Sequence, residues 1–468
     1  MKANSHSNLY LLNMALLLLG LSGCAIGPNY RRPAIEVSAS YKEEKDWKPS
    51  EPNDAISRGV WWSIFIDPQL DQLESQIDIS NQNVKAAAAA VEEAQALVQE
   101  AQAGFWPTLA ANFGRQRSRT RLGDVQTTNS AGITGSWNID IWGQIRRSTE
   151  SNKASAQASA AALAAVRLSA QGQLATDYFQ LRAQDQLQSL LNDTVQAQEK
   201  SLKIAESRFR FGVAAKGDLV SAQTQLLTSQ AQQVNAGIQR AILEHAIAVL
   251  IGQSPSTFSL TNAAMRTDVP TIPPGLPSAL LERRPDIAEA ERKVAAANAQ
   301  IGVARAAFFP TLTLSGSDDF SGGSISKLIR ASNRVWAFGP SLAQTLFAGG
   351  LHRAQARAAS AAFDLSVDSY RQTVLTGIQQ VEDQIATLRL LGKQSALEDA
   401  VVKAAQEAEG LILNQYKAGT VPYSSVISAQ TTTLSSRETA LTVLLDRLTA
   451  SVSMIEALGG GWEASQLR

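Results

Sequence analysis

The feature that most limits the fold of this chain is a pair of very long segments without proline. They run from Gln144 to Phe211 and from Gly350 to Ala418, which is 68 and 69 residues. Apolar side chains recur along both at three- and four-residue steps, the period of an amphipathic α-helix. At a rise of 1.5 Å per residue, a continuous helix of this length would reach about 100 Å. Such a helix exceeds the width of a compact domain, so the pattern predicts an elongated molecule.

Each long segment ends in a glycine turn and is followed by a shorter return helix. The spacing predicts helical hairpins over about 144–251 and about 350–458. The two turns align at an offset of 207 residues, which pairs Gly212 with Gly419. Glycine is the usual residue at a helix end because it adopts left-handed backbone at little cost.

A second repeated phrase marks a change from helix to strand. "FWPTL" begins at Phe105 and "FFPTL" at Phe308, 203 positions later, and the hydrophobic period after each becomes two. We expect strand hairpins over about 105–142 and 308–347. One face would carry the apolar side chains, with Gly316 in the same row, namely Phe105, Leu109, Ala111, Phe113, Ile133, Trp137, Ile139, Ile141, Leu312, Leu314, Trp336, Phe338, Leu342 and Leu346. The other face is rich in Thr, Ser and Asn, as in a strand between lipid and water, although a half-buried soluble hairpin has the same period.

Four strands cannot complete a sheet inside a membrane. An open edge in lipid leaves backbone groups unpaired at several kcal/mol each, and closed barrels need about eight strands or more. The chain would therefore oligomerise. Two copies would give eight strands around a filled interior, whereas three would give twelve and leave room for a channel.

The two halves are expected to interlock as one unit. We place the repeats at about 62–265 and 275–458, joined by a proline-rich segment from Asp268 to Ile287. Because neither half closes a sheet alone, residues 24–468 are interpreted as a single unit.

The N-terminus indicates export and a lipid anchor. An apolar run from Leu9 to Leu21 follows Lys2 and is too short to span a bilayer, as in a secretory signal. Leu21 and two small residues precede Cys24, a pattern that resembles a bacterial lipobox. This predicts a signal peptide over 1–23 and a lipidated, palmitate-bearing Cys24 in the outer membrane. The alternative is a plain signal peptide with a chance cysteine.

Composition argues against several function classes. Lys and Arg together number 42, as do Asp and Glu, so no basic field favours nucleic acid. One cysteine and three scattered histidines give no metal site, and we find no nucleophile elbow or phosphate loop. We expect neither an enzyme nor a cofactor. Isolated carboxylates such as Asp140 are attributed to a wet lumen.

One basic run allows two interpretations. "RQRSRTR" places Arg115, Arg117, Arg119 and Arg121 on one face of the first strand. They belong either to a solvated loop or to a contact with phosphates of lipopolysaccharide in the outer leaflet. Detergent or chelator sensitivity after their neutralisation would discriminate between the two.

Several motifs together resemble one family. They are "CAIGPNYRRP" at Cys24, "WWSIFIDPQLDQL" at Trp61, the two aromatic-Pro-Thr-Leu phrases, "LLERRPDI" at Leu280 and the two glycine turns. The chain resembles the outer membrane factors, the TolC-like ducts, and particularly their lipoprotein branch. The resemblance implies an α+β membrane protein: a homotrimer with a twelve-stranded transmembrane β-barrel, four strands per protomer, continued by a twelve-helix periplasmic α-barrel.

The same resemblance implies a function and a set of sites. The function is the exit duct of a tripartite efflux pump, with a periplasmic adaptor and an inner-membrane pump of the resistance-nodulation-division class as partners. The adaptor-docking tip would comprise Phe209, Gly212, Val213, Ala214, Tyr416, Gly419, Thr420 and Val421. The gate would comprise Asp218, Tyr416, Ser425 and Ser428, the two serines standing where some relatives carry aspartates.

Other functions stay open at this point. A duct of the same build could export metal ions or secrete proteins instead of drugs. A structural periplasmic coiled-coil lipoprotein would share the anchor and the long helices, but it does not predict the repeated strands. Single-channel conductance separates a duct from a spacer.

Overall fold

The computed structural model describes residues 25–35, 38–43, 60–119, 123–272, 280–463 and 465. Within them the chain divides into two compact units. The first contains Ala89–Ala160, Glu289–Gln372 and the described N-terminal residues up to Ile35. The second contains Ala161–Ala288 and the described parts of Glu36–Ala88 and Thr373–Arg468. Each unit therefore draws on both halves of the sequence. The predicted signal peptide, Cys24 and Arg121 lie outside the described residues.

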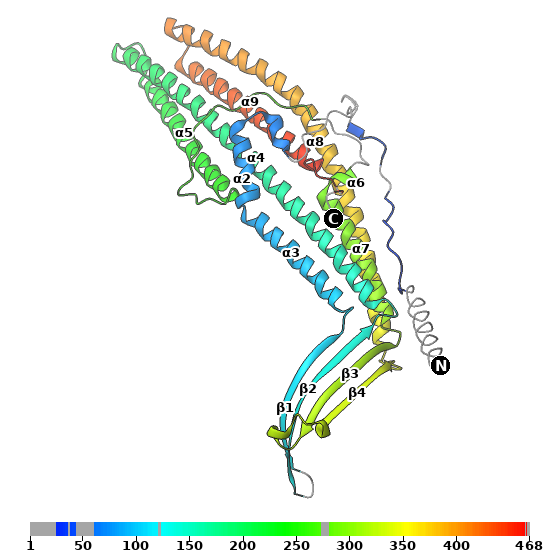
Figure 1. The fold of residues 1–468 in the computed structure, drawn as a ribbon. Helices are drawn as coiled ribbons and strands as arrows, with labels where there is room; N and C mark the ends of the chain where they lie inside the picture. The colour runs from blue at the N-terminus through cyan, green and yellow to red at the C-terminus, as the bar shows by residue number, and fades with distance from the viewer. Residues whose placement is uncertain are drawn as a thin grey trace. The chain divides into compact units, whose positions relative to one another are not determined.

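The first unit holds a four-stranded antiparallel sheet. Its strands are β1 (Thr108–Arg119), β2 (Val125–Ile139), β3 (Thr311–Gly322) and β4 (Arg334–Ala343), and they lie side by side in chain order (Figure 1). The pairing of β2 with β3 joins the two halves of the chain, a link that the period of the strands did not reveal.

The register gives the sheet one apolar and one polar face. Directly paired residues share a face, and one row runs from Leu109 through Gly135 and Gly316 to Phe338. Seven large apolar side chains on this face are exposed, namely Leu109, Phe113, Ile133, Trp137, Trp336, Phe338 and Leu342, whereas Ile139, Leu312, Leu314 and Phe320 on the same face are partly buried. The opposite face carries mostly Thr, Ser and Asn. The division agrees with the alternation expected from the sequence.

The connection between β1 and β2 is shorter than expected. The polar, glycine-containing sequence from 121 to 130 predicts a connecting loop over that range, but β2 already begins at Val125 and pairs residue by residue with the end of β1. The residues concerned include Val125, Thr127 and Thr128, whose β-branched side chains favour strand backbone. Between β3 and β4 lie two short 3-10 turns, η4 (Ile325–Lys327) and η5 (Ala331–Asn333).

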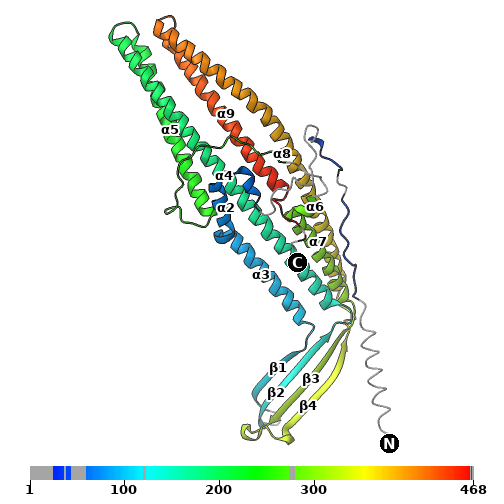
Figure 2. The same cartoon turned by 45° about the horizontal axis from the view of Figure 1, so that its top comes forward.

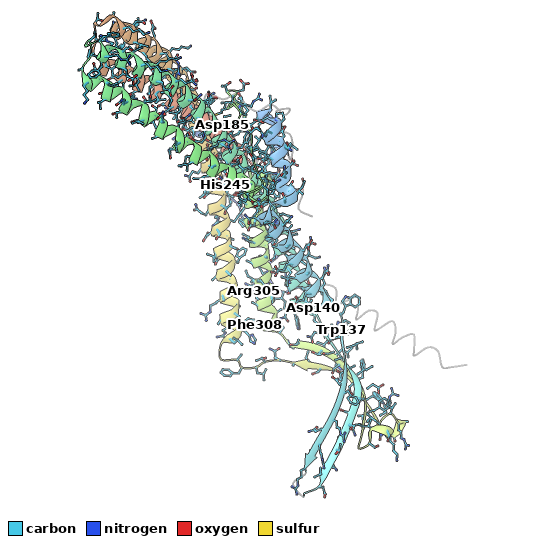
Figure 3. The ribbon with its side chains drawn as sticks, turned by 90° about the vertical axis from the view of Figure 1, so that its left-hand side faces the viewer. Trp137, Asp140, Asp185, His245, Arg305 and Phe308 are labelled. Carbon is cyan, nitrogen blue, oxygen red and sulfur yellow. The ribbon has the colours of Figure 1, made fainter. Side chains whose placement is uncertain are left out.

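At the base of the sheet the strands connect to helices. β1 follows α3 (Gln82–Ala103), and β3 follows α7 (Pro285–Ala306). Asp140, which follows β2 (Figure 3), accepts hydrogen bonds from the backbone amides of Ile145 and Arg146 at 3.1 and 2.9 Å. It caps the N-terminus of the next helix and also pairs with the Arg146 guanidinium at 3.3 Å. The earlier interpretation of Asp140 as an isolated carboxylate in a wet lumen is therefore wrong.

Long helical hairpins dominate the second unit. One is made of α4 (Gln144–Arg210) and α5 (Lys216–Leu250), the other of α8 (Leu351–Ala418) and α9 (Tyr423–Ala457) (Figure 2). Asp185 of α4, labelled in Figure 3, pairs with Arg240 of α5 at 2.6 Å and with Arg182 at 2.7 Å. None of the helices in the described ranges combines the length and the apolarity needed to cross a membrane.

Shorter elements complete the second unit and explain two sequence motifs. In "WWSIFIDPQLDQL", η2 (Trp61–Phe65) is buried, and Phe65 lies 4.9 Å from the ring of Phe179. Asp67 caps α2 (Pro68–Ser80) and accepts the hydroxyl of Tyr178 at 2.8 Å. The motif "LLERRPDI" contains α6 (Leu280–Arg283). Its Arg284 is buried and pairs with Asp286. Arg284 also donates to the carbonyl of Ala457 at 2.9 Å.

Candidate functional site

The candidate site lies at the turns that end α4 and α8. In the first turn the amide of Gly212 donates to the Phe209 carbonyl at 2.9 Å, and the amide of Val213 donates to the Arg208 carbonyl at 2.8 Å. Gly212 has a φ of +74°. This pair of bonds satisfies the last carbonyls of α4 and is a Schellman helix end, which requires left-handed backbone at the glycine.

The second turn repeats the first bond for bond, 207 residues later. Gly419 donates to Tyr416 and Thr420 donates to Gln415, both at 3.0 Å. The φ of Gly419 is +81°. The repeated sequence therefore encodes the same helix end twice, and the chain reverses direction at both places.

Beneath the turns lies a buried apolar cluster, here called the turn cluster. It contains one or more residues from each of the four long helices, namely Ala205, Ala222, Tyr416, Tyr423 and Val426. The rings of Tyr416 and Tyr423 lie 5.2 Å apart. Since the cluster includes residues of both hairpins, it holds the ends of the hairpins together.

Arg208 joins the two hairpins directly. Its guanidinium lies 4.7 Å from the ring centroid of Tyr416, and Nη1 donates to the Tyr416 carbonyl at 2.5 Å. The contact combines a cation–π interaction with the favourable placement of a cation at the C-terminus of a helix. Sequence reasoning missed this residue, although two arginines flank Phe209 in the last turn of α4.

The electrostatic environment keeps both tyrosines neutral. Burial raises the pKa of Tyr416, the charge of Asp218 adds to the rise, and Arg208 opposes it. Burial, together with Tyr416 and Asp218, raises the pKa of Tyr423 to about 12. Among the described residues the Tyr416 hydroxyl has no hydrogen-bond partner. Asp218 therefore influences the tyrosines through its charge and not through a hydrogen bond.

The predicted site residues differ in how far they are exposed to solvent. Tyr416 is buried with an exposed fraction of 2%, whereas Phe209, its equivalent in the first turn, is 41% exposed. Of the gate set, Asp218 and Ser425 are partly buried and Ser428 is exposed. The remaining residues of the docking set are Gly212, Val213, Gly419 and Thr420, which are exposed, and Ala214 and Val421, which are partly buried. Only Tyr416 belongs to the turn cluster, and Val421 packs against it.

A four-stranded sheet with one apolar face and a pair of long helical hairpins are features that known proteins share. The family model described as "Outer membrane efflux protein" matches residues 73–253 and 276–460. The chain belongs to the outer membrane efflux protein family.

Individual relatives agree over the whole length. The pyoverdine export outer membrane protein OpmQ of Pseudomonas aeruginosa is 31% identical, with 99% of this chain and 98% of that protein covered. The cation efflux system protein CusC of Escherichia coli is 28% identical, with 95% and 97% covered. The solved outer-membrane channel OprN matches at a TM-score of 0.86 and 28% identity, with 94% and 100% covered.

These matches confirm the predicted fold class and the broad function. This outer membrane efflux protein has the α+β fold of the TolC-like channels and acts as an outer membrane channel component of efflux. Its three named relatives are channel or efflux components, and none of these names describes an enzyme.

Proposed function

We propose that three copies of this efflux protein form the exit duct of a tripartite pump. The observation that carries the proposal is the sheet: among the residues that the structure describes, β1 and β4 each have one neighbouring strand, so one edge of each is unpaired there. Unpaired strand edges inside lipid are costly, and pairing β4 of one copy with β1 of the next would remove them. Three copies would give twelve strands with the polar face lining the channel.

A second observation supports assembly. One side of α5 carries an exposed apolar row, here called the α5 stripe, whose members are Val220, Leu227, Val234, Ile238, Ile242 and Val249. Several of them recur at seven-residue steps, the spacing of a helix that packs against another helix. A helix of the neighbouring copy would cover this row and complete a helical wall.

The turns would serve as the docking tip and the gate. The two exposed glycines of the docking set, Gly212 and Gly419, would suit the close approach of a helical hairpin from a periplasmic adaptor. Tyr416, Arg208 and the other contacts of the turn cluster would hold the two hairpins together in the closed duct. An inner-membrane pump of the resistance-nodulation-division class would deliver cargo through the adaptor.

Membrane attachment and cargo complete the proposal. Lipidation at Cys24 would anchor the protein in the outer membrane, and the helical part would extend into the periplasm. The polar face of β2 and β3 offers mainly hydroxyl and amide groups, so the wall provides little fixed charge for selecting cargo. We therefore assign selection to the pump and rank small organic molecules, including drugs, above metal ions or proteins. The role needs neither a cofactor nor catalysis.

A cation duct is the second candidate, because the relative CusC is named for cation efflux. A structural periplasmic spacer is the third. Efflux of dyes and of metal salts, measured in a strain that lacks the protein, separates a duct for small organic molecules from a cation duct. The spacer is tested by conductance, since a spacer passes no current.

The decisive experiment records single channels from the purified lipidated protein in planar bilayers. We expect a trimer by mass and a low open probability in the wild type. Arg208→Ala removes the link between the hairpins and should raise the open probability about tenfold, as expected for the loss of a cation–π contact and a charged hydrogen bond. Arg210→Ala, two residues away and exposed, is the matched control. A monomer, or a wild-type protein and Arg208→Ala that both pass no current, would contradict the duct.

A further inference from the structure

Three arginines of β1 share the apolar face of the sheet. Arg115, Arg117 and Arg119 follow Leu109 and Phe113 at two-residue steps, so all five side chains point to one side. The intervening glutamine and serine point to the other side and are uncharged. A solvated loop does not require this alternation, yet it continues to the last residue of the strand.

The positive charge of this segment is not neutralised within the described residues. On β2 the partners of the three arginines are Asn129, Thr127 and Val125, all neutral. Arg119 donates from Nε to the carbonyl of Gly123 at 3.2 Å, and neither Arg115 nor Arg117 has a carboxylate at ion-pair distance in the described ranges.

Another arginine on the same face shows a different arrangement. Arg334 of β4 pairs with Asp318 of β3 through two bonds of 2.7 and 2.8 Å. Both residues share the face that carries Trp336 and Phe338. Within the described part of the chain, the arginine beside the apolar band is thus paired with a carboxylate, and those at the end of β1 are not.

The position along the strand fits the boundary between hydrocarbon and headgroups. On β2 this face runs from Ile139 to Ala131, the partner of Phe113, which at about 3.3 Å per residue is about 26 Å along the strand. The apolar band of an outer membrane protein is about 25 Å tall. Arg115 is the next residue on this face, about 7 Å beyond Phe113, and Arg119 lies about 20 Å beyond it. The three arginines therefore begin where the apolar band ends.

We propose that Arg115, Arg117 and Arg119 bind the phosphate groups of the phosphorylated glycolipid, lipopolysaccharide, in the outer leaflet. The guanidinium group presents a planar fork of donors that matches phosphate oxygens, and three such groups on one face suit a headgroup with more than one phosphate. The inference rests on the proposed function, which places the loop end of the sheet at the outer leaflet. It adds a lipid site on the outside of the duct.

The first test uses the wild-type protein alone. The full-length protein is placed in nanodiscs of phosphatidylcholine and titrated with diphosphorylated lipid A or with lipid A stripped of both phosphates. We expect the phosphorylated form to bind at least about tenfold more tightly, given the effect of each basic residue near an anionic lipid. Excess inorganic phosphate should not displace it. Equal binding of the two lipids would overturn the proposal, and displacement by free phosphate would overturn the assignment to a lipid.

Variants test the residues and the face. Arg115→Gln with Arg117→Gln and Arg119→Gln should lose the preference for the phosphorylated lipid, while the corresponding lysine variants should keep most of it. The shifted variant Arg115→Gln, Gln116→Arg, Arg117→Gln, Ser118→Arg keeps the net charge but turns two arginines to the polar face, and it should lose the preference too. Full binding by the glutamine or the shifted variant would overturn the proposal.

Conductance of the same samples separates this inference from the duct itself. The glutamine variant should conduct as the wild type does, because its changed residues lie on the face away from the channel. A wild-type protein that binds the phosphorylated lipid but passes no current would refute the duct and leave the lipid site standing.

Discussion

At the scale of single residues, two carboxyl groups, one buried and one partly buried, make stability depend on pH. Glu74 of α2 is fully buried, and neither of its oxygens has a hydrogen-bond partner among the described residues. Burial raises its pKa well above the ordinary value, and the nearby Asp78, Glu456 and Asp71 add to the rise. Burial also raises the pKa of Glu456 from 4.5 to about 7, against the opposing charge of Arg284.

Glu456 provides the sharper prediction. Since the folded chain keeps this proton up to about pH 7 while the unfolded chain loses it near pH 4.5, stability should fall as pH rises through that window. The loss amounts to about 3 kcal/mol at most. Glu456→Gln should flatten the dependence and raise the melting temperature at pH 8. Thermal melts at pH 5 and pH 8 check this, with the exposed Glu93→Gln as control. An unchanged pH dependence in Glu456→Gln would refute the assignment.

Residue roles were only partly predictable from the sequence. Tyr416 was assigned through the resemblance, and it does lie at the centre of the turn cluster. Arg208 and Tyr423 were missed because their importance comes from contacts between different helices. Arg208, for example, contacts Tyr416, which is 208 residues away in the sequence. A single sequence shows the period of a helix but not which neighbour its side chains meet.

At the scale of elements, a substitution at either glycine turn should act through the backbone conformation and not through a steric clash. A side chain at Gly212 would meet no heavy atom within 4 Å, and one at Gly419 would meet only Arg208 Nη2 at 3.6 Å. The cost of a substitution is therefore the left-handed backbone, about 1 to 2 kcal/mol for a residue with a Cβ. The damage should stay local to the turn.

We therefore expect Gly212→Val or Gly419→Val to abolish efflux while the protein still inserts as an oligomer. Dye accumulation in cells and the amount of oligomer in outer membranes measure the two effects. Gly217→Val is the matched control, because its Cβ also meets open space and its backbone is not left-handed. Normal efflux in both turn variants would show that the turns are not the docking tip.

Strands and long helices were the most predictable elements, and their connections the least. Alternation over 10–15 residues places the strands, and the missing prolines place α4 and α8. The loop between β1 and β2 was predicted too long because Asn129 and Ser130, whose residue types favour turns, here lie in β2. The pairing of β2 with β3 is invisible to periodicity, since both strands would alternate in the same way with any partner.

At the scale of the whole molecule, assembly should depend on the α5 stripe. Leu227→Glu with Val234→Glu places two charges on the apolar row, and burying them against another copy would cost several kcal/mol. We expect a monomer or dimer in detergent by light scattering coupled to size-exclusion chromatography. Gln232→Glu with Gln239→Glu adds the same charge at exposed positions on another side of α5, and this control should remain trimeric. A trimer in the stripe variant would show that other surfaces drive assembly.

The unequal ends of the two hairpins affect how partners can be counted. One turn presents the exposed ring of Phe209, whereas the equivalent ring of Tyr416 is withdrawn into the cluster. A ring of three copies would therefore offer six turns of two alternating kinds. A partner that requires the exposed phenylalanine would bind with one molecule per protomer, and a partner indifferent to it would bind with two. The measured stoichiometry of the complex would thus report which hairpin the partner recognises.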